Sequence, residues 1–404
     1  MDITMRGDCC MKKKVLKDVN FKGKKVLVRV DFNVPLEEGE VTDNNRIEAA
    51  LPTIEYLIGE NAKVLLMSHL GRPGGEVDDS LRLDPVAAEL ADLLGQEITK
   101  VDDCIGTEVA EAVEGMQDGD VVLLENTRFY PGEKKNDPDF AKKLAAPADV
   151  FVLDAFGAAH RAHASTVGVG DYLPSAAGFL MQRELNALGE VMENPEHPFL
   201  AIMGGAKVSD KLGVIRNLYK KVDYLIVGGG IANTFIAAKG YEIGDSLAET
   251  GKLDLARELM KEAGENDVEL VLPVDVVVAD RFAADADSKT VPIDSIPEGW
   301  QVLDADGPRS IKYYREIVKK MKTIIWNGPM GVFEFDKFAV GTNEMAKALA
   351  ESDAKTVIGG GDSAAAIKKA GYSEQMDHIS TGGGASLMFF EGKPLPAVEA
   401  LDDA

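Results

Sequence analysis

The sequence predicts an α/β protein with parallel sheets, organised as two lobes of similar size. From about residue 22 it repeats one order: a short apolar run, a loop rich in Gly, Asn, Asp and Pro, and an amphipathic stretch of about ten residues or more. That order is typical of strands that alternate with helices. One predicted helix at 179–195, ended by Asn and Pro, separates two such series, so we place the joint between the lobes there.

The first series contains four predicted strands, at 24–33, 62–69, 120–129 and 149–157. Their nearly continuous apolar runs suit strands that are covered on both faces. Helices are predicted between them at 45–61, 83–95 and 137–145. We expect the last two to begin with Asp84 and Asp137 as N-caps, because a proline follows each of them.

The second series contains six predicted strands, and it begins directly after the helix at 179–195. They lie at 198–205, 222–230, 268–278, 322–331, 355–363 and 377–384. Two α/β lobes follow from the two series.

Composition excludes several classes of protein. Of the 404 residues, 45% are hydrophobic and 28% are charged, which is not typical of disordered or collagen-like chains. The net charge of −24 argues against non-specific nucleic-acid binding. No apolar run approaches the roughly 18 residues of a spanning helix, and the N-terminal segment lacks the apolar middle of a signal peptide. We therefore expect a cytoplasmic protein that binds neither nucleic acid nor membrane.

Three cysteines give a hypothesis about the compartment. Cys9, Cys10 and Cys104 are odd in number and lack the spacing of a disulfide framework. We expect them to stay reduced and to be structural or incidental, which agrees with a reducing compartment.

The strand ends of the first lobe are basic. In open α/β sheets, ligands bind beyond the carboxyl ends of the strands. The residues there are Arg29, Arg46, His69, Arg72, Arg128, His160, Arg161 and His163. Guanidinium groups recognise carboxylate and phosphate oxygens by paired hydrogen bonds, so this gathering predicts a small, multiply anionic ligand.

The first strand leaves one assignment open. Arg29, Asp31 and Asn33 alternate with apolar residues, so the period of two places all three on one side of the strand. Arg29 either faces the ligand or is structural, for example as the ion-pair partner of Asp31.

The strand ends of the second lobe are rich in glycine. The segments are GGAKVSDK (204–211), GGG (228–230), NGPMG (327–331), GGGDS (359–363) and TGGG (381–384). Glycines after a strand let backbone N–H groups approach a phosphate, so five such loops together point to a nucleotide. Lys207 and Lys211 share a face if their segment is helical. Asp362 suits a Mg²⁺ ligand beside phosphates, an N-cap, or both.

Several chemistries are excluded by missing motifs. The chain has no P-loop, no protein-kinase HRD or DFG motif, no nucleophile elbow and no HExxH or CxxC pair. GGGDSA at 359–364 loosely matches a dinucleotide motif, but no acid follows at the expected distance. Two other functions remain open: an NAD-linked dehydrogenase, which would bind NADH, and a non-catalytic sensor, which would not need both Lys207 and Arg46 aimed at one cleft.

Eight segments, in order along residues 29–387, resemble the motifs of the phosphoglycerate kinase family. They are RVDFNVP, SHLGRP, LLENTRF, DAFGAAHRAHAS, GGAKVSDK, WNGPMGVFE, GGGDS and STGGGASL. The resemblance implies a monomer of two Rossmann-like, doubly wound parallel-sheet lobes joined by a helical hinge. The implied division is a phosphoglycerate-binding lobe at 1–178, an interdomain helix at 179–195 and a nucleotide-binding lobe at 196–390, with 391–404 packing back on the first lobe.

The resemblance also implies the reaction and its residues. The reaction is reversible phosphoryl transfer between 1,3-bisphosphoglycerate and ADP, giving 3-phosphoglycerate and MgATP, in line and in a closed cleft. The implied substrate-binding residues are Asp31, Phe32, Asn33, Arg46, His69, Leu70, Gly71, Arg72, Arg128 and Arg161. The implied nucleotide-binding residues are Gly204, Gly205, Lys207, Lys211, Asn327, Glu334 (at the ribose), Gly360, Gly361, Asp362 (at Mg²⁺) and Ser363. Arg46, Lys207 and Lys211 are implied as catalytic.

Departures from the family pattern are small. The first fourteen residues or so extend beyond the usual start, and Ser363 stands where many members have Thr, which keeps the hydroxyl group.

Overall fold

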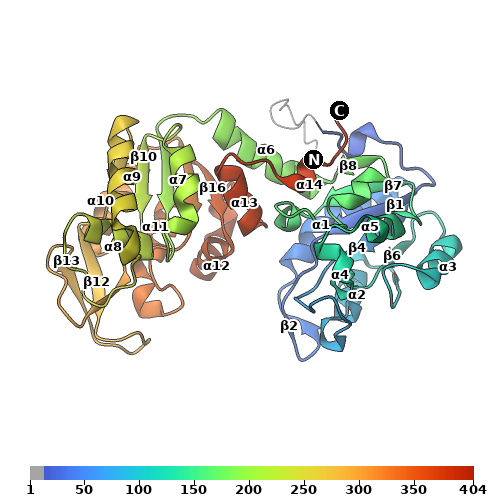
Figure 1. Ribbon diagram of the computed structural model, residues 1–404, viewed down its shortest axis with the longest axis horizontal. Helices are drawn as coiled ribbons and strands as arrows, with labels where there is room; N and C mark the ends of the chain where they lie inside the picture. Colours follow the sequence, from blue (N-terminus) through green and yellow to red (C-terminus); the bar gives the residue numbers. More distant parts are fainter. Residues whose placement is uncertain (1–12) are drawn as a thin grey trace. The chain divides into compact units, whose positions relative to one another are not determined.

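The computed structural model describes residues 13–404, so Cys9 and Cys10 lie outside the described residues. The described chain forms two compact units: unit 1 contains residues 13–186 and Pro394–Ala404, and unit 2 contains Ala187–Lys393 (Figure 1). The chain passes from one unit to the other within helix α6 (Phe179–Glu193), the helix that the sequence predicts at 179–195.

Unit 1 is built on a six-stranded sheet in the order β5-β6-β4-β1-β7-β8, and every neighbouring pair is parallel. The strands are β1 (Lys25–Val30), β4 (Lys63–Met67), β5 (Thr99–Lys100), β6 (Val121–Leu123), β7 (Val150–Asp154) and β8 (Ser175–Ala177). The four predicted strands are confirmed in shorter form as β1, β4, β6 and β7. The edge strands β5 and β8 escaped prediction because two or three residues carry too little pattern. A small hairpin pairs β2 (Leu36–Glu37) with β3 (Glu40–Val41).

Unit 1 also contains helices and 3₁₀ turns. They are α1 (Asn45–Gly59), α2 (Asp84–Leu94), α3 (Thr107–Gly115), α4 (Pro131–Lys134), α5 (Pro138–Ala145) and α14 (Pro396–Glu399), with the 3₁₀ turns η1 (Leu16–Asp18), η2 (Asp79–Leu81), η3 (Thr127–Phe129), η4 (Phe156–Ala158) and η5 (Gly168–Asp171). Helices α1 and α2 pack on the sheet face that carries Val26, Val28 and Val30, in one continuous apolar core. Because side chains alternate along a strand, Arg29 lies on the opposite face.

One of the two predicted N-caps is confirmed. Asp137 accepts a hydrogen bond from the Phe140 amide and begins α5. Asp84 is not an N-cap: it is the first residue inside α2, and its Oδ2 pairs with Lys100 Nζ at 3.2 Å. The Asp84 carboxylate thus pairs with Lys100 of β5 and does not accept a backbone N–H at the start of α2.

Unit 2 contains a second six-stranded parallel sheet in the order β11-β10-β9-β15-β16-β17. Its strands are β9 (Phe199–Met203), β10 (Tyr224–Val227), β11 (Glu269–Val271), β15 (Thr323–Asn327), β16 (Lys355–Gly359) and β17 (His378–Ile379). Its helices are α7 (Leu212–Leu218), α8 (Gly229–Ala238), α9 (Leu253–Glu265), α10 (Pro308–Val318), α11 (Val340–Ala350), α12 (Gly361–Ala370) and α13 (Gly383–Phe390), with η6 (Ser209–Lys211), η7 (Thr250–Lys252), η8 (Asp336–Phe338) and η9 (Ser373–Gln375). Residues of α10, α11 and α12 share one core with the sheet residues Leu200, Ile202 and Trp326.

The single strand predicted at 268–278 is wrong. The structure has two strands there, β11 and β12 (Asp275–Ala279), and they belong to different sheets. Pro273 lies between them, and proline cannot donate a hydrogen bond to a neighbouring strand, so the ladder ends before it. Strand β12 joins β13 (Ser288–Pro292) and β14 (Gln301–Asp304) in an antiparallel sheet that the sequence analysis did not predict.

The C-terminal segment belongs to unit 1, and Figure 1 shows the red end of the chain among its blue and green elements. Lys14 N donates to Asp402 O at 2.9 Å, and Ala177 N donates to Lys14 O at 2.9 Å. Asp402 N donates to Ser175 Oγ at 2.9 Å. Three segments far apart in the sequence thus meet at one edge of the sheet. Among residues 13–404, no helix has both the length and the apolar character needed to cross a membrane.

Asp154 joins the sheet of unit 1 to α6. It is the last residue of β7, it is fully buried, and its Oδ1 accepts a hydrogen bond from Met181 N at 3.2 Å. A Cβ on Gly178 would lie 2.3 Å from the same oxygen, so only glycine fits at that position. Burial raises the pKa of Asp154 to about 7, although hydrogen bonds to the carboxyl group oppose the shift.

This pKa predicts a pH dependence of stability. The contribution of a neutral Asp154 is complete below about pH 4, where the unfolded chain is also protonated, and it is lost as pH rises through about 7. Between about pH 4 and 8, Asp154 should lower the free energy of unfolding of the parent by up to about 4 kcal/mol. We expect this decrease to be absent in Asp154→Asn, as measured by urea denaturation. Asp139→Asn, which changes an exposed carboxylate of the same unit, is the control and should follow the parent. Parallel profiles for the parent and Asp154→Asn would contradict the prediction.

Candidate functional site

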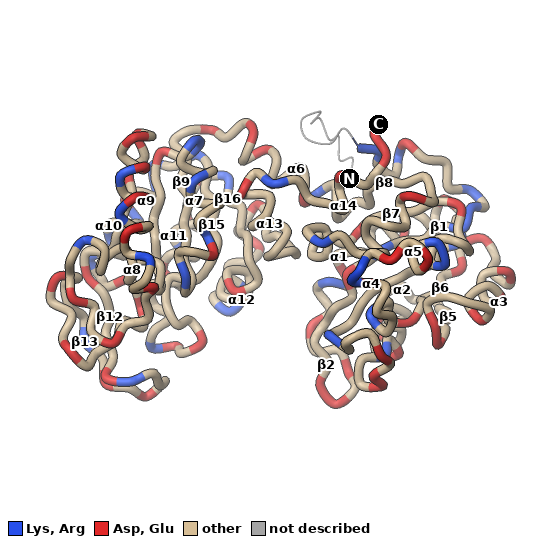
Figure 2. The backbone as a smooth tube through the Cα atoms, in the orientation of Figure 1, with Lys and Arg blue, Asp and Glu red and all other residues tan. Residues whose placement is uncertain are grey.

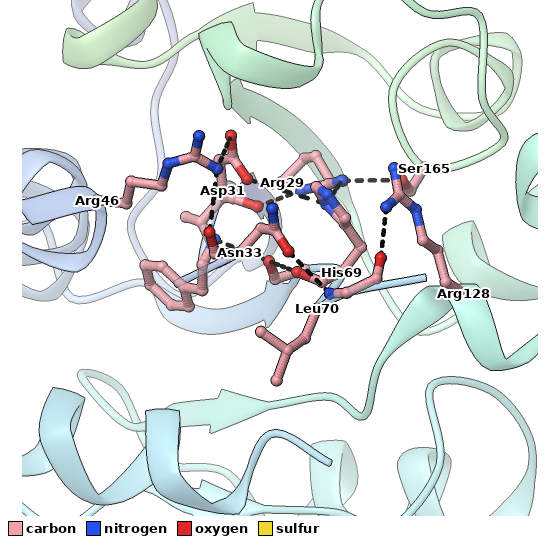
Figure 3. A network of polar contacts seen from close by, with 12 residues as sticks. Arg29, Asp31, Asn33, Arg46, His69, Leu70, Arg128 and Ser165 are labelled. Carbon is pink, nitrogen blue, oxygen red and sulfur yellow. Dashed lines mark hydrogen bonds and ion pairs between the residues drawn. The ribbon is translucent and has the colours of Figure 1, made fainter. Parts of the chain in front are cut away.

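A cluster of arginines and polar groups lies at the carboxyl ends of β1 and β4 in unit 1 (Figure 3). Acidic residues are spread along both units (Figure 2), so this cluster is a local exception to the charge of the protein. Arg46, in the first turn of α1, reaches back to the end of β1. Its Nη1 lies 3.2 Å from Asp31 Oδ2 and donates to Asn33 O at 3.1 Å. Asp31 and Asn33 therefore position a guanidinium group that is still partly exposed.

Backbone groups of the loop after β4 connect this arrangement to Arg128. Gly71 N donates to Asn33 Oδ1 at 2.8 Å, and Arg128 Nη1 donates to Gly71 O at 2.7 Å. Gly71 has a φ of +62°, a left-handed conformation that glycine adopts without strain. Glycine at this position lets the backbone N–H bond to Asn33 while the backbone carbonyl bonds to Arg128.

Arg29 does not form the ion pair with Asp31 that the sequence left open. It is 1% exposed, and its guanidinium group bonds Ser165 Oγ at 2.8 Å, His69 Nδ1 at 2.9 Å and the Val30 carbonyl. Strand β1 ends at Val30, so Asp31 and Asn33 follow the strand and Arg29 lies beneath them. Arg29 is thus a buried structural member of the cluster.

The cluster has more positive charge than the surrounding residues satisfy. Burial, together with the charges of Arg29 and Arg161, lowers the pKa of Arg128 to about 10, although the charges of Glu133 and Asp31 oppose the shift. The Nε of Arg128 is buried without a hydrogen-bond partner in the described part of the chain. A buried, unpartnered cationic donor surrounded by like charges is what a bound anion would neutralise.

The other predicted substrate-binding residues differ in their surroundings. The side chains of Phe32 and Leu70 belong to the apolar core, so only their backbone groups can meet a polar ligand. Arg161 is exposed and donates from Nε to His160 at 2.9 Å. Arg72 is exposed and takes no part in the hydrogen bonds that join the cluster in residues 13–404.

Unit 2 has a cavity of about 340 Å³ at the carboxyl ends of β9, β15 and β16. All the predicted nucleotide-binding residues except Glu334 line it: Gly204, Gly205, Lys207, Lys211, Asn327, Gly360, Gly361, Asp362 and Ser363. Glu334 is exposed and does not line this cavity. Three loops that are far apart in the sequence therefore form one site.

Close backbone contact explains two glycines that line the cavity, Gly204 and Gly328. A Cβ on Gly204 would lie 2.1 Å from the Pro329 carbonyl oxygen, and a Cβ on Gly328 would lie 2.2 Å from that of Gly204. The loops after β9 and β15 hence cross with no room for a side chain, which leaves their amides close to the cavity.

Lys211 and Asn327 form the polar end of the cavity. Lys211 Nζ donates to Asn327 Oδ1, and Asn327 Nδ2 is buried with no hydrogen-bond partner in the described residues. Burial lowers the pKa of Lys211 to about 8, although the nearby Asp362 and Asp210 raise it. An ammonium group and a free amide N–H together suit phosphate oxygens.

Two local alternatives for this site are not realised. Lys207 precedes η6 and is not helical, so the condition for a shared helix face is not met, although both lysines line the cavity. Gly360 is the N-cap of α12, and Asp362 lies within the first turn. Asp362, which lines the cavity, is therefore not the N-cap of α12.

Sequence reasoning missed several residues of these sites. Asp210, Gly383 and Gly384 also line the cavity of unit 2. The GGG segment that contains Gly383 and Gly384 had been singled out, but nothing selected these positions individually. In unit 1, Glu133 and Ser165 are fully buried beneath the arginine cluster, and no signal in the sequence indicated it.

The comparisons with known proteins agree with one another. The sequence profile of a family described as phosphoglycerate kinase matches residues 16–393. A protein named phosphoglycerate kinase from Pelotomaculum thermopropionicum is 58% identical over 393 residues, which cover 97% of this chain and 100% of that protein. One of the same name from Moorella thermoacetica is 57% identical with the same coverage.

Solved structures give the same result. The structure of phosphoglycerate kinase from Coxiella burnetii has a TM-score of 0.88 and 43% identity, covering 96% of this chain and 98% of that one. That of phosphoglycerate kinase from Pyrococcus horikoshii has a TM-score of 0.84 and 37% identity, with the same coverage.

The pKa of Lys211 predicts how polyphosphate binding depends on pH. Since the ammonium form is the one that attracts phosphate, affinity for MgATP should fall above about pH 8, by up to about tenfold per pH unit. Arginine stays charged over this range, so Lys211→Arg should bind with a flatter pH profile. Calorimetric titrations between about pH 7 and 9.5 measure the difference, and identical slopes for both proteins would contradict it.

Proposed function

The chain belongs to the phosphoglycerate kinase family, and from this premise we propose how its two units divide the work. Its activity is reversible phosphoryl transfer between 1,3-bisphosphoglycerate and ADP, which gives 3-phosphoglycerate and ATP. In the reverse direction the acceptor is a carboxyl group.

We propose that unit 1 binds the phosphoglycerate. The support is the unsatisfied positive charge at the ends of β1 and β4, above all the buried Arg128 Nε without a partner. We assign the anionic groups of the substrate to Arg46, Arg128 and Arg161, with His69 as a further hydrogen-bonding group. Asp31, Asn33 and Gly71 hold these side chains in place. Arg72 would join only after a rearrangement of its exposed side chain.

We propose that unit 2 binds the nucleotide. The single observation that carries this assignment is the cavity in which backbone amides, two lysines and the unpartnered Asn327 amide converge. Phosphates would lie at the start of α12, where the N-terminal amides of the helix favour negative charge. Glu334, if it holds the ribose, does so outside the cavity described here.

Mg²⁺ fits this cavity. Asp362 lines it, and carboxylate oxygen is a ligand that Mg²⁺ prefers. No group of three or more His, Cys, Asp or Glu side chains able to hold a metal occurs in residues 13–404. We therefore propose that Asp362 holds a Mg²⁺ ion whose other ligands are phosphate oxygens and water. When bound, the ion would supply neutralisation of phosphate charge.

The chemistry needs few groups from the protein. The acceptor carboxylate is already ionised at neutral pH, so no general base is required. The transferring phosphoryl group spreads negative charge over three equatorial oxygens, and catalysis is chiefly its alignment and stabilisation. We propose that Arg46, Lys207 and Lys211 supply positive charge to these oxygens.

We further propose a cytoplasmic monomer that binds neither nucleic acid nor membrane. The net charge of −24 supports the absence of nucleic-acid binding.

One assay separates this function from the two alternatives. The protein is given ADP and 1,3-bisphosphoglycerate, and ATP formation is followed by a coupled reaction. We expect turnover that requires both substrates and Mg²⁺. Binding of both ligands without turnover would indicate a sensor, and binding of NADH would indicate a dehydrogenase; either result would overturn the proposal.

Asp362→Asn tests the metal assignment. The amide keeps the size of the side chain but lacks the charge, so nucleotide affinity should lose most of its Mg²⁺ dependence and turnover should fall. The free energy of unfolding should change by less than about 1 kcal/mol, because Asp362 is not a cap. Calorimetry of ATP binding with and without Mg²⁺ decides this, and unaltered Mg²⁺ dependence would refute the assignment.

Arg46→Ala and Lys207→Ala test the transition-state role. If each cation binds the transferring group more strongly in the transition state than in the ground state, kcat should fall far more than KM rises. Lost stabilisers of this kind cost on the order of 10² to 10³ in rate. The double variant should lose less than the product of both effects, because both residues act on one charge. If either single variant keeps kcat within about threefold of the parent while KM rises, the substituted residue binds the ground state and the transition state equally, which would contradict its proposed role.

A further inference from the structure

A buried hydrogen-bonded chain of polar side chains lies beneath the arginine cluster of unit 1 and ends at His69. Its members other than His69 take no part in the substrate contacts proposed above. Glu133, in α4, accepts hydrogen bonds from Ser165 Oγ at 2.6 Å and from Ser165 N at 3.0 Å. Arg29 Nε donates to the same Ser165 Oγ at 2.8 Å. Glu133 and Ser165 are 0% exposed, and Arg29 is 1% exposed. These groups join a helix, a loop and the central strand β1.

The hydrogen bonds that join Glu133, Ser165 and Arg29 can run in only one direction. A carboxylate only accepts and a guanidinium group only donates, whereas a serine hydroxyl has one proton to give. The Ser165 proton therefore goes to Glu133, and a lone pair of Ser165 Oγ accepts from Arg29. Burial lowers the pKa of Arg29, while the negative charges of Glu133 and Asp31 raise it. Glu133 thus opposes the cost of burying the guanidinium charge.

The other end of the chain is His69, which is 6% exposed at the end of β4. Its Nδ1 lies 2.9 Å from Arg29 Nη2, and Figure 3 shows the two side chains together. Because the guanidinium group cannot accept, Nδ1 must be the unprotonated acceptor, which leaves the proton on Nε2. Nε2 has no hydrogen-bond partner among residues 13–404.

From this geometry we propose that Glu133 and Ser165 are positioning residues: they hold Arg29, and Arg29 holds His69 as the neutral tautomer whose Nε2–H donates to phosphoglycerate. The inference rests on the proposed assignment of the phosphoglycerate site to unit 1. Neither Glu133 nor Ser165 contacts the substrate; they act through Arg29.

The charges that face His69 favour the same state. Burial lowers the pKa of its imidazole well below the usual value, and so do the charges of Arg29, Arg128, Arg46 and Arg161. The one carboxylate near the ring is Asp31, whose Oδ1 lies 3.9 Å from Nδ1 in the described structure. A neutral His69 adds no positive charge to a site that already contains several arginines. Its contribution is a directional hydrogen bond, because the single Nε2–H can donate only to an oxygen at one position.

The first arm of the test is nuclear magnetic resonance of the ligand-free protein labelled with ¹⁵N-histidine. The chain has five histidines, and the His69 signals are assigned by their loss in His69→Gln. Between about pH 5 and 8 we expect a pyridine-like Nδ1 and a pyrrole-like Nε2 in the parent. A protonated Nδ1 at neutral pH in the parent would overturn the proposal without any variant.

The second arm uses Glu133→Gln and Ser165→Ala. Each substitution interrupts the hydrogen-bonded chain that runs from Glu133 to His69. The His69 signals should then show a mixture of tautomers or a titration within the same pH range. Glu125→Gln is the matched control: Glu125 is a buried glutamate of the same unit, 1% exposed, that accepts from Arg82 and Lys100 instead. It should leave the His69 signals as in the parent. Unchanged His69 signals in both Glu133→Gln and Ser165→Ala would overturn the proposal. If Glu133→Gln does not fold, the result for Ser165→Ala decides.

The third arm is kinetic. We expect the KM for 3-phosphoglycerate to rise about tenfold in both variants, as for the loss of one charge-assisted hydrogen bond, and the KM for ATP to change by less than about twofold. A general loss of folding would instead alter both. Adding 3-phosphoglycerate to the parent should shift the Nε2 signal of His69. If the parent turns over but this signal does not respond, the inference fails while the function stands; if the parent does not turn over, the proposed function fails.

Discussion

Both sites depend on parallel pairing of strands. In a parallel sheet every strand ends at the same edge, so each loop that follows a strand delivers its residues to one place. In unit 1 the ends of β1, β4, β6 and β7 bring together residues from four separate parts of the sequence, which meet at Arg29 and its partners. In unit 2 the ends of β9, β15 and β16 do the same around one cavity. The apolar cores are what keep these edges in register.

The two proposed sites offer an anion different kinds of groups. Unit 1 uses guanidinium groups, which are charged, long and directional, and it needs a buried hydrogen-bonded frame to hold them. Unit 2 uses chiefly backbone amides that glycines leave uncovered, with Lys207 and Lys211 as the charged additions. A small acid with fixed charges suits the first arrangement, and the phosphate chain of a nucleotide suits the second.

The sequence was sufficient for the fold class and for most of the residues that gather at the two sites, because apolar runs and strand-end motifs are local patterns. It was insufficient where a partner lies far away along the chain. Arg29 and Ser165 are separated by 136 residues, so no spacing rule indicated their hydrogen bond or that Arg29 would turn away from Asp31. Asp84 satisfied the local rule for an N-cap, yet its ion pair with Lys100 prevailed. Pro273 was visible within the run at 268–278, but the apolar residues around it concealed that the strand ends there.

The meeting of Lys14, Ser175 and Asp402 has a consequence for how the protein is made. Unit 1 holds the earliest part of the chain that the structure describes, yet it is closed by Asp402, which lies 227 residues beyond Ser175. The ribosome adds residues in order, so all of unit 2 is synthesised before this contact can form. Unit 1 is thus begun first and completed last, and until Asp402 is made the Ser175 amide of β8 and the Lys14 amide beside it lack their acceptors. The nascent chain must therefore keep that edge from pairing with other strands throughout the synthesis of unit 2.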